Sequence, residues 1–429
     1  MKRINVIGAG LAGSEACYFL LKKGYEVHLY EKRPKVMTPA HETPYFGELV
    51  CSNSLKGKAI TNACGLLKEE IRLMGSIMME SSNQSEVPSG GALSVDRELF
   101  AKYITEKLKS FPNLIIHEED VTTLDESFPT IVATGPLTSD SLVVFLKKIT
   151  NSEDLFFFDA SAPIIKKESI DFNKAYYKSR YDQGDDSYIN CPFSKEEYDV
   201  FYHELVNAEL AMVHEFDKHY FEGCMPIEVM AKRGYDTIRF GPLKPKGLQR
   251  EGYPKAFAVV QLRQDNVIND LYNIVGFQTN LTYGEQKRVF RLIPGLENAE
   301  FVRYGLMHRN TYLNAPLLLN EDLSLKGHPN IYIAGQLAGV EGYVESAAMG
   351  LLAAIFIDQK LTKNSAELPP IRTMCGSLLN YITHANTKDF SPMNANFGIL
   401  FGANKYNKEE VANYALELIK EYYAKVQRD

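Results

Sequence analysis

The chain has 429 residues, of which 45% are hydrophobic and 24% are charged, and its formal net charge at pH 7 is −7. This length allows two domains with a large buried core. The acidic balance argues against indiscriminate binding to nucleic acid, although a local basic surface is compatible with it. The sequence has no apolar run long enough for a membrane span and no charged-then-apolar leader. We therefore expect a cytoplasmic protein without membrane contact.

Six cysteines are spread along the chain without a C-x-x-C pair and without regular spacing. Zinc sites and disulfide frameworks both depend on such spacings. We therefore expect free thiols and no bound metal.

The opening stretch carries a glycine fingerprint between two strands. A short apolar strand ends at Gly8, glycines follow at Gly10 and Gly13, an amphipathic helix runs to about Lys23, and a second strand ends in Glu31. The first glycine permits a tight turn, the second lets backbone N–H groups approach a pyrophosphate, and the third lets the helix pack close to the strand. The acidic residue accepts hydrogen bonds from an adenosine ribose. The motif predicts dinucleotide binding rather than a purely structural turn.

Helical and strand patterns alternate along the rest of the chain. Helices are predicted at Gly65–Met79, Asp96–Phe111, Ser194–Tyr220, Gly284–Leu292 and Asn407–Gln427. Strands are predicted at Leu114–His117, Thr130–Thr134, Ala256–Gln261 and Leu271–Phe277. From about residue 151 the composition becomes richer in Phe, Tyr and charged residues, which indicates an inserted domain.

A second strand–glycine–helix element lies near the other end of the chain. A strand from Asn330 runs into Gly335, Gln336 and Gly339, and a helix is predicted at Val344–Ile357. In two-dinucleotide flavoproteins such an element covers the flavin half of FAD, although by itself it is also compatible with an ordinary turn. The two motifs together predict an α/β fold. We expect a discontinuous Rossmann-like FAD-binding domain (residues 1–150 and 320–429, with a C-terminal helix) and an inserted α+β domain facing the substrate (residues 151–319).

Two cysteines have neighbours that favour a reactive thiolate. Cys224 lies just before Pro226, a residue favoured in the first turn of a helix, where the positive end of the helix dipole stabilises a thiolate. Cys51 is followed by the polar run Ser52–Ser54, which can donate hydrogen bonds to it. For each cysteine the alternative is an incidental or buried thiol.

A basic stretch occupies residues 232–255. Aromatic residues alternate there with cations, as in surfaces that stack bases and contact phosphates. The candidates for weak RNA binding are Lys232, Arg233, Arg239, Lys244, Lys246 and Arg250. The alternative is a solvated charged face.

Several long motifs carry a family resemblance. They are Val6–Ala16, Glu48–Ser54, Phe221–Met230, Val260–Asp265, Met307–Thr311, Gly339–Ser346 and Pro392–Phe397. These segments are distributed along nearly the whole chain. In them the sequence closely resembles the folate- and FAD-dependent RNA uridine-5-methyltransferases. That family forms 5-methyluridine in the T-loop of tRNA, and one branch acts on large-subunit (23S) rRNA. The longer glucose-inhibited-division-type tRNA-modifying enzymes share its FAD domain.

The resemblance implies three small-molecule partners: FAD, 5,10-methylenetetrahydrofolate as carbon donor, and NADPH or NADH as the source of electrons. It implies that the first glycine motif and Glu31 bind the adenosine half of FAD, and that the late glycine motif holds the flavin half. His308 is expected to stack on the pterin, with Arg309 near its glutamate tail. The alternative for His308 is a core histidine.

The resemblance also assigns the two thiols. Cys224 is expected to attack uracil and Cys51 to support the reaction near the flavin, with the exchange of these roles equally open. The RNA remains open between tRNA and rRNA, because Gly241–Lys255, Asn266–Asp270, Leu337, Ala338 and Met349 depart from what is expected of tRNA-modifying members. Two further readings are a FAD-dependent NAD(P)H oxidoreductase and a FAD-containing RNA-binding factor without catalysis.

Overall fold

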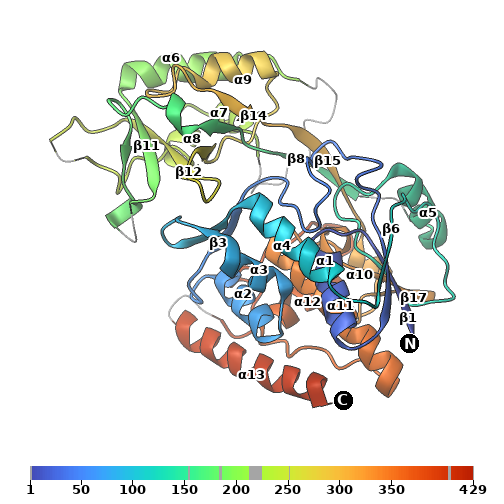
Figure 1. Ribbon diagram of the computed structural model, residues 1–429. Coiled ribbons are helices and arrows are strands. Elements are labelled where there is room, and N and C mark those ends of the chain that lie inside the picture. The colour runs from blue at the N-terminus through green and yellow to red at the C-terminus, as the bar shows by residue number, and fades with distance from the viewer. Residues whose placement is uncertain are drawn as a thin grey trace.

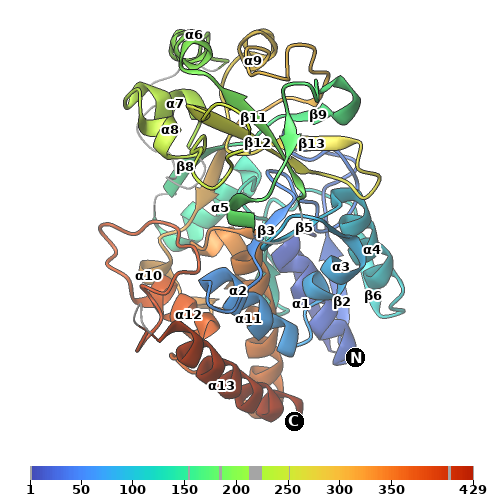
Figure 2. The same cartoon turned by 90° about the vertical axis from the view of Figure 1, so that its left-hand side faces the viewer.

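The structure is a computed structural model that describes residues 2–152, 155–182, 186–211, 225–250, 252–403 and 407–428. Figure 1 shows a lower part built from the beginning and end of the chain and an upper part built from its middle. The chain crosses between them in β8 (Leu155–Ala160) and β15 (Met307–Tyr312). These two strands pair antiparallel, with Met307 opposite Ala160. Figure 2 shows the same division from the side.

The lower part is organised around a mixed sheet. Its strand order is β16 (Ser324–Leu325), β17 (His328–Ile333), β7 (Thr130–Val132), β1 (Arg3–Ile7), β2 (Glu26–Tyr30) and β6 (Leu114–His117). All neighbours are parallel except β16 and β17. β1 lies centrally, with Val6 opposite Leu29 on one side and Ile131 on the other. This arrangement confirms the predicted α/β, Rossmann-like fold.

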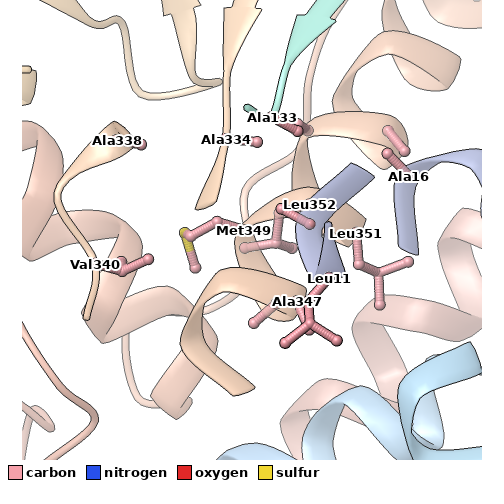
Figure 3. Close-up of a cluster of buried hydrophobic side chains, with 14 of the residues drawn as sticks. Leu11, Ala16, Ala133, Ala334, Ala338, Val340, Ala347, Met349, Leu351 and Leu352 are labelled. Atoms are coloured by element: carbon pink, nitrogen blue, oxygen red, sulfur yellow. The ribbon is translucent and has the colours of Figure 1, made fainter. Parts of the chain in front are cut away.

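Two helices from opposite ends of the chain pack together on this sheet. They are α1 (Leu11–Lys22) and α11 (Tyr343–Lys363). A Cβ atom on Gly350 of α11 would lie 2.0 Å from the carbonyl oxygen of Ala12, so this close approach requires glycine. Figure 3 shows the apolar core between the two helices and the ends of β7 and β17, which includes Leu11, Ala16, Ala133, Ala334, Ala347, Met349, Leu351 and Leu352.

Further elements surround this core. The helices are α2 (Ala63–Leu73), α3 (Ile77–Ser85), α4 (Arg97–Lys109), α5 (Asp140–Thr150), α10 (Ala315–Leu318), α12 (Met374–His384) and α13 (Lys408–Arg428), and η4 (Gly335–Ala338) is a short 3-10 turn. A small antiparallel sheet consists of β3 (Ser54–Gly57), β5 (Ala92–Val95) and β4 (Glu86–Val87). No helix in the described part of the chain is long and apolar enough to cross a membrane.

The upper part is built on an antiparallel sheet. Its order is β10 (Tyr176–Tyr177), β11 (Tyr188–Phe193), β12 (Ala258–Gln264), β13 (Leu271–Ile274), β9 (Ile164–Lys166) and β14 (Phe301–Arg303). The helices of this part are α6 (Lys195–Val206), α7 (Ile227–Lys232), α8 (Thr237–Phe240) and α9 (Tyr283–Phe290), and its short 3-10 turns are η1 (Lys167–Ser169) and η2 (Arg180–Asp182). It has a hydrophobic cluster of its own, which includes Phe193, Tyr198, Phe201, Phe277 and Phe290.

The predicted helix over Gly65–Met79 is wrong as a single element. The chain forms α2 and α3 instead, because Gly75 adopts a φ of +79° and ends the first helix. Ser76 then starts the second helix, since its hydroxyl accepts a hydrogen bond from the N–H of Met79.

The predicted helix over Ser194–Tyr220 is too long. α6 begins as expected, with a capping box between Ser194 and Glu197, but it ends at Val206. The chain then turns to contact the segment before α9, where the N–H of Ala211 donates to the carbonyl of Asn280. Residues 212–220 lie outside the described residues.

Candidate active site

Two adjoining cavities lie where β1, β2, β7 and β17 reach their carboxyl ends. The first is lined by Gly8, Gly10, Gly335 and Gln336 of the two glycine motifs and by Glu31. The second is lined by Cys51. They share the lining residues Val50, Pro136, Gln336, Tyr343 and Ser346. The structure therefore brings the two motifs and one of the two predicted thiols to a single place, at the sheet edge where α/β proteins bind ligands.

The three glycines of the first motif have different environments. Gly8 has a φ of +95°, and a Cβ there would lie 2.6 Å from the carbonyl oxygen of Ala133. A Cβ on Gly13 would lie 1.8 Å from the carbonyl oxygen of Gly8, so α1 can start this close to β1 only with glycine. Gly10 lines the first cavity and has open space around its Cα. This open cradle at the start of α1 fits the pyrophosphate of FAD.

Glu31 is fixed at the wall of the first cavity by Arg33. The Arg33 Nε donates to Glu31 Oε1 at 3.0 Å, and the N–H of Ala9 donates to Oε2 at 2.9 Å. Burial acts to raise the pKa of Glu31, but the hydrogen bonds and charge of Arg33 outweigh it, and the net shift is downward. The carboxylate therefore stays charged, as an acceptor for ribose hydroxyls requires.

One part of the late glycine motif lines the first cavity, and another part packs against a neighbouring side chain. Gly335 and Gln336 line the first cavity. Gly339 has a φ of +87°, and a Cβ there would lie 2.3 Å from the ring of Phe390. Gly339 thus serves a turn that packs against Phe390, and its predicted contact with the flavin half stays a prediction.

Cys51 is half-buried and held by Tyr343, the first residue of α11. The backbone N–H groups of Cys51 and Ser52 donate to the Tyr343 hydroxyl oxygen at 2.7 and 3.0 Å. The Cys51 Sγ lies 3.6 Å from the carbonyl oxygen of Ala160, at the end of β8. Burial raises the pKa of Tyr343, so its phenol stays neutral.

An ion pair between an exposed lysine and a buried carboxylate lies in the same cavity. The Lys56 Nζ lies 3.4 Å from Oε1 of Glu345, whose side chain is fully buried. Burial acts to lower the pKa of Lys56, but the Glu345 carboxylate outweighs it, and the net shift is upward. Lys56 also has a φ of +63°, which is uncommon for a residue with a side chain. The cavity of Cys51 therefore holds a charged lysine paired with a carboxylate.

The other described cysteines are buried and free, as predicted. They are Cys17, Cys64, Cys191 and Cys375. Burial raises the pKa of each thiol, to about 11 for Cys64, so these groups stay protonated and unreactive.

Three predicted site residues cannot be placed by their side chains. Cys224 lies outside the described residues. The helix expected after it is present, because α7 begins at Ile227 with Pro226 at its N-cap. His308 and Arg309 lie on β15, but their side chains are outside the described part of the structure.

The predicted RNA-binding residues lie in the upper part, on α7, α8 and the loops that follow them. Arg239 is engaged within the protein, with Nη1 3.0 Å from Asp236 and its guanidinium 4.0 Å from the Phe257 ring centroid. The Arg250 guanidinium lies 3.9 Å from the ring centroid of Tyr253, whose side chain is 53% exposed. Exposed aromatic rings beside cations suit RNA. In the described part of the chain, no group of three or more His, Cys, Asp or Glu side chains is placed to hold a metal.

A family model described as glucose inhibited division protein A matches residues 3–365. The chain belongs to this family. Within the family, it is 54% identical over 427 residues to the methylenetetrahydrofolate--tRNA-(uracil-5-)-methyltransferase TrmFO of Listeria innocua, which covers 98% of both chains. It is 53% identical over 430 residues to the protein of the same name from Staphylococcus epidermidis, covering 98% of this chain and 99% of that one. The expected family resemblance is therefore confirmed.

Solved structures of the glucose inhibited division protein A family share the fold. Aquifex aeolicus GidA in its form II crystal superposes with a TM-score of 0.72 at 17% identity, covering 99% of this chain and 73% of that chain. The form I crystal gives a TM-score of 0.70 at 17% identity, covering 99% of this chain and 78% of that chain. This likeness supports the Rossmann-like fold of the chain.

Sequence reasoning missed several residues of the site. They are Arg33, Lys56, Asn310, Tyr343 and Glu345. Arg33 had a local signal, since it follows Glu31 by two positions. Tyr343 and Glu345 lie inside a family motif, but the motif does not say what they contact. Their partners are distant in sequence and become visible only in the fold.

Proposed function

We propose that this protein is a flavin-dependent RNA methyltransferase that forms 5-methyluridine in tRNA. It uses 5,10-methylenetetrahydrofolate as carbon donor and FAD reduced by NADPH or NADH. The observation that carries the proposal is the position of Cys51, whose cavity shares its lining with the dinucleotide cavity. The printed names of both relatives support the folate and the tRNA uracil.

FAD fits the first cavity by the open cradle at Gly10 and the charged carboxylate of Glu31. We assign the adenosine half to Gly8, Gly10, Gly13 and Glu31, and the flavin half to Gly335, Gln336 and Gly339. When bound, FAD supplies the hydride chemistry that no side chain can provide.

The chain's thiols activate the RNA base. Carbon 5 of uracil is a poor nucleophile, so a cysteine thiolate Sγ forms a bond to carbon 6, and the electrons of the C5=C6 bond move onto the carbonyl oxygen at carbon 4. Carbon 5 of this enolate then takes the one-carbon unit. Loss of the carbon 5 proton releases the carrier of the carbon unit and leaves an exocyclic methylene on carbon 5. A hydride added to that methylene, with expulsion of the cysteine thiolate from carbon 6, gives the methyl group and restores the C5=C6 double bond. We assign the attack to Cys224 and a supporting role to Cys51, with the reverse assignment as the alternative.

The remaining side chains prepare this step. Tyr343 fixes the backbone that carries Cys51, and Lys56 places a positive charge in the cavity where the enolate forms. We further assign His308 to the pterin and Arg309 to the glutamate tail. Lys232, Arg233, Arg239, Lys244, Lys246 and Arg250 are proposed to contact the phosphates of the structured RNA.

We also propose that residues 1–150 and 320–429 form the FAD-binding domain and residues 151–319 the RNA-facing domain. Sheet membership supports this division, because the strands of the Rossmann-like sheet come from both ends of the chain. The two separate hydrophobic clusters support an inserted part as well, because one of them runs from Ala162 to Phe301. The segment Tyr312–Leu319 belongs to the other cluster, so the packing puts the end of the inserted part before Tyr312. A cytoplasmic location stays a prediction that follows from the tRNA substrate.

The test is to incubate the FAD-loaded protein with methylenetetrahydrofolate, NADPH or NADH, and either unmodified tRNA or unmodified 23S rRNA. We expect 5-methyluridine in the tRNA by nucleoside mass spectrometry. Product only in rRNA would favour a methyltransferase that acts on rRNA. The altered stretch Gly241–Lys255 supports that alternative. No product in either RNA, with NADPH oxidation intact, would favour the oxidoreductase.

A further inference from the structure

Asn310 is a buried carboxamide in the cavity of Cys51 that has no hydrogen-bond partner within the described part of the chain. It lies on β15, its side chain is 1% exposed, and it lines the second cavity. Its Oδ1 and its Nδ2 both lack a hydrogen-bond partner among the described residues. Buried polar groups in native proteins are nearly always paired, so an unpaired carboxamide at a cavity wall indicates a ligand as its partner.

Other buried asparagines of this chain show what a structural role looks like. Asn53 is fully buried, and its Nδ2 donates to the carbonyls of Val95 at 3.1 Å and Gln264 at 2.9 Å. Its Oδ1 accepts a hydrogen bond from Arg263 Nε at 3.0 Å. The fold thus supplies hydrogen-bond partners for both polar atoms of Asn53, whereas the residues that the structure describes supply none for those of Asn310.

The chemistry of a carboxamide limits what that molecule can be. A carboxamide presents an acceptor oxygen and an N–H donor side by side. The complementary ligand edge is a ring N–H next to a ring carbonyl, as in a cyclic imide. We propose that Asn310 binds such an edge through its Oδ1 and Nδ2 when a ring enters the cavity of Cys51.

Under the proposed function, on which this identification of the ring rests, two molecules bring a cyclic imide to this cavity. One is the target uracil of the RNA, through N3–H and its neighbouring carbonyl. The other is the pyrimidine part of the flavin in FAD, which has the same edge. Asn310 makes the same two hydrogen bonds in either case, so separate binding measurements must distinguish them.

The test compares the wild type with Asn310→Leu, which keeps the volume and removes both polar atoms, and with Asn310→Asp, which keeps an acceptor and removes the N–H donor. Asn273→Leu is the matched control, because Asn273 is also buried, its Nδ2 also lacks a partner among the described residues, and it lies on β13 and lines neither cavity. One probe is FAD, titrated into FAD-free protein by fluorescence. The other is a T-loop RNA hairpin with uridine or N3-methyluridine at the target position.

We expect Asn310→Leu to lower the affinity for one of the two probes about tenfold or more, and Asn310→Asp to lower the affinity for the same probe. Asn273→Leu should leave both affinities unchanged. A loss confined to FAD names the flavin. A loss for the uridine hairpin, together with loss of discrimination against N3-methyluridine, names the uracil. The ligand-free melting temperature of Asn310→Leu should be unchanged or higher, since an unpaired polar group has been removed.

Two results would overturn the inference. In the first, both affinities of Asn310→Leu stay within twofold of a wild type that binds the probes. In the second, the ligand-free protein is destabilised and neither affinity changes, which would make the carboxamide structural. A wild type that binds neither FAD nor the hairpin would instead contradict the proposed function, and this inference with it.

Discussion

The hydroxyl oxygen of Tyr343 accepts a hydrogen bond from the backbone N–H of Cys51 at 2.7 Å. A second bond comes from the next residue, Ser52, at 3.0 Å. One phenol at the start of α11 therefore holds the loop that carries the thiol. Because α11 also packs on α1, this contact connects the thiol to the helix of the dinucleotide motif.

Tyr343→Phe should lower methylation by roughly 10- to 100-fold and retain FAD, because the loop of Cys51 loses its acceptor. Two N–H groups are left without their partner, so the free energy of unfolding should fall by about 1–3 kcal/mol. The measurements are kcat, the flavin absorbance per protein and a urea titration. Tyr283→Phe is the control, since Tyr283 is exposed and its ring stacks on Tyr304. Activity of Tyr343→Phe within twofold of the wild type would contradict this role.

Gly13→Ala and Gly10→Ala should fail in different ways. At Gly13 the added Cβ would lie 1.8 Å from the carbonyl oxygen of Gly8, so the FAD-free fold itself should lose stability. At Gly10 the Cβ meets nothing within 4 Å, so the FAD-free protein should melt normally but bind FAD more weakly. Melting curves and FAD titrations separate the two effects. Equal FAD affinity of Gly10→Ala and wild type would count against the pyrophosphate cradle.

Glu70 should make stability depend on pH. Its buried carboxyl accepts hydrogen bonds from the N–H groups of Met374 and Cys375 at 2.7 and 2.8 Å, and burial raises its pKa from 4.5 to about 7. Since the folded state binds this proton more tightly than the unfolded state, the stabilising contribution is complete at acid pH. It is lost as the pH rises through about 7.

Glu70→Gln removes this titration and serves as the reference. Between pH 5 and 8 the wild type should lose up to roughly 3 kcal/mol of unfolding free energy relative to the variant. Urea titrations at each pH provide the values. A constant difference between the two proteins across this range would show that Glu70 does not titrate there.

Arg250→Gln should weaken RNA binding mainly at low salt. If the guanidinium beside Tyr253 contacts a phosphate, its removal should reduce the magnitude of one slope by about 1. This is the slope of the logarithm of the RNA association constant against the logarithm of the salt concentration. Lys425→Gln is the control, because Lys425 lies on α13 and pairs with Glu367 at 2.9 Å. An unchanged slope for Arg250→Gln would place the RNA elsewhere.

The parts of the site that the sequence predicts depend on local geometry. Gly8 and Gly13 are needed where a strand turns directly into a helix, so their spacing is sufficient evidence of the turn. The break between α2 and α3 was missed because an apolar pattern continues across Gly75, although that glycine and Ser76 carried the signal. The long-range pairs could not be predicted. Nothing near Cys51 in sequence indicates Tyr343, and nothing near Asn310 indicates that its carboxamide lacks a partner.

The most direct test of the central claim follows the carbon atom. The FAD-loaded protein is incubated with isotope-labelled methylenetetrahydrofolate, NADPH and unmodified tRNA, and the nucleosides are analysed by mass spectrometry. We predict labelled 5-methyluridine with the wild type and none with the double variant Cys51→Ala/Cys224→Ala. Unlabelled tRNA from a wild-type protein that binds FAD, oxidises NADPH and retains the tRNA would contradict it.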